Sequence, residues 1–144
     1  MDFSIASVLL AGLAWWYGLP VGAHLLWLVP LLALLMALAF ALGLLIASVG
    51  TFQRDVLFAI PFLFQFGLLA TPVMYPASAV PPQWRVFYDL NPLVGPIEGF
   101  RRVIVHGAAP DMGALAVSAA VAAVLLAVAL PVFRAASRYF ADIL

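Results

Sequence analysis

Two long stretches of this chain contain no Asp, Glu, Lys or Arg, and they constrain the fold more than any other feature. They run from Phe3 to Gln53 and from Met112 to Phe133, and together they make up about half of the 144 residues. Charged residues are only 8% of the chain, whereas soluble domains carry about 25%. A soluble fold of this size could not hide so much apolar surface. The chain is therefore predicted to be an integral membrane protein.

Four apolar segments are candidates for membrane-spanning helices, because a span of the ~30 Å hydrocarbon core takes about 20 residues. Trp15, Trp16 and Tyr17 end the first, where an aromatic belt is expected. A signal peptide is the weaker interpretation of this segment, because no basic residue precedes it. The prediction is an all-α integral membrane fold with four transmembrane helices. The segments cover residues 3–19, 24–49, 57–74 and 112–133.

Small residues recur at four-residue spacing in the second and fourth segments. Such spacing lets helices approach closely within lipid. Close packing at these positions is one interpretation. The other, preferred for any one triplet, is that alanine is simply common in these segments. The sets are Ala33, Ala37 and Ala41; Ala39, Gly43 and Ala47; Ala116 and Ala120; and Ala119, Ala123 and Ala127.

The third segment has an aromatic face. Phe58, Phe62, Phe66 and Leu69 recur at helical spacing, and Gln65 lies beside them. Sugars pack their C–H faces on aromatic rings, and polar groups within membranes usually face protein or a cavity. Phe58, Phe62 and Gln65 are therefore candidates for a substrate path. The alternative is a row of lipid-facing phenylalanines.

A polar, proline-rich segment from Thr71 to Arg102 separates the third and fourth apolar segments. Pro81 and Pro82 suit the start of a helix. Trp84, Phe87 and Tyr88 then share one side of a short amphipathic helix, with Gln83, Arg85 and Asp89 on the other side. The candidate substrate path also includes three aromatic residues of this segment, Tyr75, Trp84 and Tyr88.

A second short helix is predicted from Pro92 to His106, ended by Gly107 and Pro110. Its apolar face is expected to be Leu93, Ile97, Phe100 and Ile104. Fifteen residues make about 23 Å of helix, which is too short to span. The helix is therefore either flat on the surface or re-entrant.

Three charged residues of this second helix are candidate gate residues. Glu98 precedes Arg101 by three positions and Arg102 by four, the favourable order for helical ion pairs. Arg101 and Arg102 could instead hold a lipid phosphate.

Adjacent Arg54 and Asp55 indicate a solvent-side turn between the second and third segments. The arginines divide three and three between the two sides of the membrane, so charge alone does not orient the chain.

Several chemistries lack the residues that they need. The chain has no cysteine and no lysine, which excludes disulfides, a P-loop and Schiff-base catalysis. Zero formal net charge argues against nucleic acid as a partner. His24 and His106 are isolated, and the carboxylates form no obvious pair. We predict no catalytic residue, no metal site and no cofactor bound by this chain.

Four linked motifs carry a family resemblance: FQRDV (52–56), TPVMYP (71–76), VPPQW (80–84) and NPLVGPIEGFRR (91–102). In this order and spacing they resemble the second half of an ABC-2 type exporter permease of the polysaccharide, O-antigen or teichoic-acid branch. The resemblance implies that residues 1–144 are a partial ABC-2 membrane domain, without the first two helices and the coupling segment.

The resemblance also implies an activity and partners. Such permeases export lipid-linked glycans across the bacterial inner membrane as dimers, with separate ATPase subunits that bind ATP and Mg. It places residues 53–55 in the cytoplasm and residues 75–110 outside, at the channel mouth. Membrane lipid is a further expected partner. Two alternatives remain open: a membrane enzyme acting on a lipid phosphate through Arg101 and Arg102, and a membrane assembly subunit that does not transport.

Overall fold

The computed structural model describes residues 2–18, 22–52, 55–71, 73, 75 and 79–141, and each regular element within these ranges is helical. The all-α prediction is confirmed for them. The elements are α1 (Asp2–Trp16), η1 (Ala23–Trp27), α2 (Leu28–Phe52), α3 (Asp55–Ala70), η3 (Pro82–Trp84), α4 (Arg85–Asp89), α5 (Val94–His106) and α6 (Met112–Ala141).

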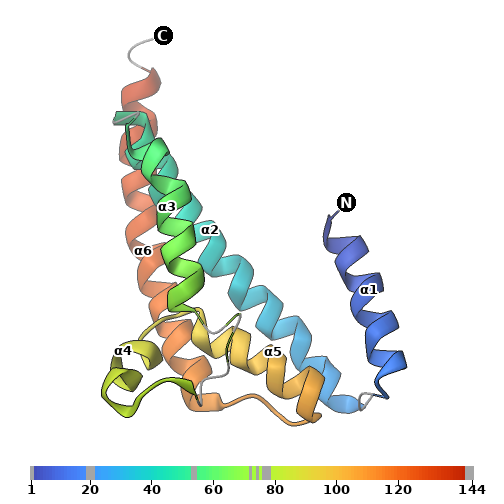
Figure 1. Cartoon of the computed structure of the whole chain (residues 1–144). Helices are drawn as coiled ribbons and strands as arrows, with labels where there is room; N and C mark the ends of the chain where they lie inside the picture. Colours follow the sequence, from blue (N-terminus) through green and yellow to red (C-terminus); the bar gives the residue numbers. More distant parts are fainter. Residues whose placement is uncertain are drawn as a thin grey trace.

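Helices α2 and α6 lie side by side and run in the same direction (Figure 1). Helix α3 returns beside them, and α4 and α5 lie at the end of the bundle away from the C-terminus. Helix α1 stands apart from the bundle, and its N-terminus points toward the same end as the C-terminus. The short helices predicted between the third and fourth segments are thus gathered at one end of the molecule.

Two of the four predicted spans meet the requirements of length and composition for crossing a membrane. They are residues 23–50 and 112–137, whereas α1 has 15 residues and α3 has 16. The second span begins as a 3₁₀ turn at η1 and continues as α2. Helix α3 ends at Ala70, earlier than the predicted Met74, which lies outside the described residues. The next proline, Pro72, has no N–H with which to continue the helix.

The core is a seam between α2 and α6. Its buried positions recur at intervals of three, four and seven residues, the periodicity of coiled coils. Small residues on α6 let the larger side chains of α2 pack closely. The hydroxyls of Ser48 and Ser118 donate to the carbonyls of Leu44 and Ala114, so both buried polar groups are satisfied. The seam consists of Leu31, Leu38, Ala41 and Ser48 on α2, and Ser118, Ala122, Ala129 and Ala136 on α6.

Most members of the small-residue sets are not buried within this chain. Of these sets, Ala41 is buried and Ala37 is partly buried, while the other members on α2 and on α6 are exposed. The physical reason is that alanine occurs on every side of these helices. Four-residue spacing therefore did not identify the side that meets a partner.

Helix α5 packs through small and β-branched residues, and not through the predicted apolar face. Gly95 approaches the backbone of Ala114 on α6, and Gly99 lies against Leu31 on α2. Leu93, Ile97, Phe100 and Ile104 are only partly buried. The missing side chains at Gly95 and Gly99 let α5 come closer to the α2–α6 pair than larger residues would permit. The buried residues of α5 are Val94, Gly95, Pro96, Gly99 and Val103.

The end of α5 agrees with its prediction. Gly107 has a φ of 61°, in the left-handed region that glycine adopts readily. The N–H groups of Gly107 and Ala108 both bond to the carbonyl of Arg102, which satisfies part of the helix end. The chain then turns through Pro110 into α6.

Candidate functional site

The end of α3 is connected to the start of α5 by a short chain of hydrogen bonds. The Thr71 hydroxyl donates to the Gly67 carbonyl at 2.6 Å and accepts from Asn91 Nδ2 at 3.4 Å. The other side of the Asn91 amide, Oδ1, accepts the Leu93 N–H at 3.0 Å. Asn91 thereby holds the turn before α5, although the N-cap position itself is Leu93. These hydrogen bonds therefore connect the end of α3 to the turn that precedes α5.

Two tyrosines lie next to this connection. The ring centroids of Tyr75 and Tyr88 are 6.4 Å apart, with the ring planes inclined by 40°. Tyr75 donates its hydroxyl hydrogen to the Leu69 carbonyl at 2.8 Å, close to the end of α3. Tyr88 is 7% exposed and its hydroxyl has no hydrogen-bond partner among the described residues. Burial and the negative charge of Glu98 raise the pKa of the Tyr88 hydroxyl above the usual range of tyrosine.

The two arginines of α5 have different partners. Arg101 Nη1 lies 2.5 Å from Glu98 Oε1, and both side chains are mostly buried. Arg102 Nη1 lies 3.8 Å from Asp111 Oδ2 across the loop to α6, and both of these side chains are largely exposed. The predicted ion pair of Glu98 is thus present with Arg101, while Arg102 is paired with a residue of the following loop.

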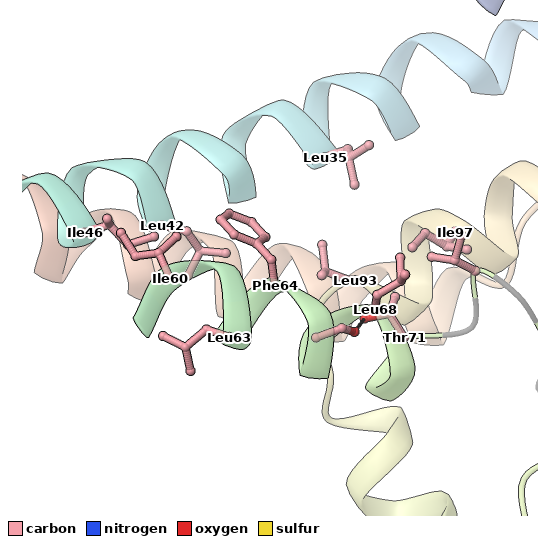
Figure 2. A pocket seen from close by; sticks show the side chains of 12 residues that line it. Leu35, Leu42, Ile46, Ile60, Leu63, Phe64, Leu68, Thr71, Leu93 and Ile97 are labelled. Carbon is pink, nitrogen blue, oxygen red and sulfur yellow. Dashed lines mark hydrogen bonds between the residues drawn. The ribbon is translucent and has the colours of Figure 1, made fainter. Parts of the chain in front are cut away.

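A cavity of about 490 Å³ lies between α2, α3 and α5 (Figure 2). Its walls are apolar apart from Thr71, and they include Phe64 and Leu68 from α3 and Ile97 from α5. Ile97 belongs to the predicted apolar face of α5. This face therefore borders the cavity and is not the side through which α5 packs on α2 and α6. The cavity separates α3 from α2 over part of the length of α3.

The predicted aromatic face lies on the outside of α3. Phe58, Phe62 and Phe66 are 77%, 64% and 70% exposed, and Gln65 is exposed beside them. The cavity-lining residues of α3 are a different set, which includes Ile60, Phe64 and Leu68. The aromatic face is therefore not covered by any described part of this chain and is accessible to lipid, solvent or another molecule.

The remaining predicted site residues are scattered. Trp84 is the last residue of η3 and is 57% exposed, whereas Tyr88 is buried. Arg54 lies outside the described residues. Asp55 is the first residue of α3, and its side chain and that of Phe87 are also outside them. Of the predicted path, the structure brings Tyr75 and Tyr88 into contact, near the Glu98–Arg101 pair, and leaves Phe58, Phe62 and Gln65 on a separate face.

Sequence reasoning missed Thr71, Asp111 and the glycine contacts of α5. Asp111 Oδ1 accepts the N–H groups of Gly113 and Ala114, so it caps α6 as well as pairing with Arg102. An Asp immediately before a long apolar helix is a recognisable capping signal. The four-residue spacing of Gly95 and Gly99 was another available signal. The bond between Thr71 and Asn91 joins residues 20 positions apart and had no signal in the sequence.

These features define a helical membrane protein with two helices of spanning length and a polar helical segment at one end. A family model described as ABC-2 type transporter matches residues 3–105, and the chain belongs to this family. Membership identifies residues 3–105 as part of an ABC-2 type transporter membrane domain.

One similar protein within this family has a more specific description. The chain is 29% identical over 131 residues to the "O-antigen export system permease protein RfbA" of Myxococcus xanthus. This match covers 87% of the chain and 50% of the relative, so the chain spans about half the length of that protein. No solved structure matches.

Proposed function

We propose that this chain forms part of a permease that exports a lipid-linked polysaccharide, such as an O-antigen, across a bacterial inner membrane. The observation that carries the proposal is the similarity to an O-antigen export permease over most of the chain, together with membership of the ABC-2 family. The apolar helices and the polar helical segment at one end of the bundle are compatible with such a role.

The proposal includes three partners. A separate ATP-binding-cassette subunit supplies ATP hydrolysis, with ATP and Mg bound there, because a P-loop requires a lysine and this chain has none. A second permease copy completes a dimer, and membrane lipid surrounds both. The exposed Phe58, Phe62 and Gln65 face the glycan path in that assembly, and Glu98 and Arg101 belong to its outer gate.

Co-purification tests this function. The chain, expressed with its native neighbours and extracted in mild detergent, should bring an ATPase with it in a fixed ratio.

In that complex Phe62→Ala should lower glycan export several-fold while assembly stays intact, because Phe62 contributes contact area and not packing. An ATPase that never co-purifies would contradict the proposal. Turnover of a lipid phosphate by the chain alone would favour the enzyme alternative, and an intact complex without any export would favour an assembly subunit.

Orientation is testable by labelling, since the chain contains no cysteine. We propose that η3, α4 and α5 lie on the outer side of the membrane and that the end of α6 lies in the cytoplasm. Gln83 in η3 and Ser137 near the end of α6 are both exposed. A cysteine at position 83 should react with a membrane-impermeant maleimide in intact cells, and a cysteine at position 137 should react only after permeabilisation. The reverse pattern would invert the orientation.

A further inference from the structure

Tyr88 carries a hydroxyl group that the fold itself does not use. Its side chain is buried, and within the part of the chain that the structure describes the hydroxyl has no hydrogen-bond partner. A buried hydroxyl without a partner lowers stability, because it has given up its bonds to water. Phenylalanine would fill the same space without this cost. An unsatisfied group of this kind needs an explanation other than folding.

Tyr75 is a matched comparison in the same place. Its ring contacts that of Tyr88, but its hydroxyl donates to the Leu69 carbonyl. That bond satisfies one of the carbonyls that the end of a helix leaves open. One of the two phenols is therefore committed to the backbone, and the other retains an unused donor.

The charges around Tyr88 select the chemistry of a partner. Besides Tyr75, the groups that act on its hydroxyl are Glu98, Asp89 and Arg101. The hydroxyl stays protonated at physiological pH, since burial and Glu98 both disfavour its ionised form. A neutral phenol donates to an oxygen acceptor, and the nearby carboxylate disfavours an anionic one. An uncharged hydroxyl on a sugar ring meets these conditions, and the ring can pack on the aromatic pair.

We propose that Tyr75 and Tyr88 form a subsite for a sugar ring of the transported glycan, with the Tyr88 hydroxyl donating to a sugar oxygen. The subsite rests on the proposed export function for the presence of a glycan. Because Tyr88 is buried, the subsite is closed in this structure. A sugar can reach the Tyr88 hydroxyl only if the residues that cover it move.

The test uses the whole chain in lipid nanodiscs, with methyl β-D-glucopyranoside and inorganic phosphate as probes. Tyr88→Phe is compared with Tyr75→Phe for thermal unfolding and for probe binding by saturation-transfer NMR. We expect Tyr88→Phe to keep or raise Tm and to weaken glycoside binding at least threefold. Tyr75→Phe should lower Tm, because its hydroxyl bonds to the backbone.

Several results would overturn the subsite. A lower Tm in Tyr88→Phe would mean that the hydroxyl is bonded within the folded chain. Equal glycoside affinity in Tyr88→Phe and wild type, or no glycoside binding by wild type, would remove its role as a ligand contact. Binding of phosphate in place of the glycoside would indicate an anion site. The binding assay needs no ATPase, so it is independent of the export test. The subsite proposal can be rejected while co-purification and export still support the exporter. Equally, glycoside binding can be observed in a chain that does not export.

Discussion

Gly95→Ala is expected to separate α5 from α6 and to cause one of the two largest losses of stability in this chain. A Cβ at position 95 would lie 2.6 Å from the Ala114 carbonyl oxygen and would also collide with the Ser118 hydroxyl. The carbonyl belongs to the backbone of α6 and cannot rotate away. Overpacking of this kind costs about 1–3 kcal/mol. The apparent free energy of unfolding, measured by denaturant titration in mixed micelles, should fall by that amount.

Two other glycines provide controls for Gly95→Ala. A methyl group added at Gly43 on α2 would have nothing within 4 Å, so Gly43→Ala should be neutral or stabilising by up to about 1 kcal/mol. Gly99→Ala should be intermediate, because a Cβ there meets the flexible end of Leu31 at 2.6 Å. Equal effects at positions 43 and 95 would show that α5 does not pack on α6 as described.

Glu98→Gln is expected to destabilise the α5 region and to impair gating. Glu98 and Arg101 are 21% and 26% exposed, so the pair lies largely outside bulk water. Removing the carboxylate charge beside a mostly buried guanidinium costs roughly 1–3 kcal/mol. The double variant with Arg101→Gln should recover part of the loss. Unfolding and export should be read separately across the full double-mutant cycle.

Arg102→Gln is the matched control for the Glu98 cycle. Arg102 lies one position further along α5, but its pair with Asp111 is longer and more exposed. Exposed pairs contribute about 0–1 kcal/mol, so this change should have little effect. A Glu98–Arg101 coupling below about 0.5 kcal/mol would equal that of a helix surface in water and would contradict a sheltered position. Coupling seen in export alone would place the pair in the gate.

Local signals predicted the elements of this fold well. Charge-free length predicted the long helices, Pro81 and Pro82 predicted the start of η3, and Gly107 predicted the end of α5. The three-residue spacing of Glu98 and Arg101 predicted their ion pair. Each of these depends on residues that are close in sequence, where helix geometry alone fixes the contact.

The packing faces could not be predicted in the same way. When nearly every side of a helix is apolar, hydrophobic periodicity no longer indicates the buried side. The α2–α6 seam and the buried face of α5 were therefore missed. The contact between Tyr75 and Tyr88, and the bond between Thr71 and Asn91, depend on how α3, α4 and α5 meet. The substrate path and gate remain predictions.

The parallel seam between α2 and α6 has a consequence for how the protein is made. Helix α6 begins 60 positions after α2 ends, so α2 leaves the ribosome well before its partner exists. At about 5–20 residues per second, the delay is roughly 3–12 s. During that interval Leu31, Leu38 and Ser48 face lipid or the insertion machinery. The seam-facing side of α2 therefore enters the membrane before α6 is available to cover it.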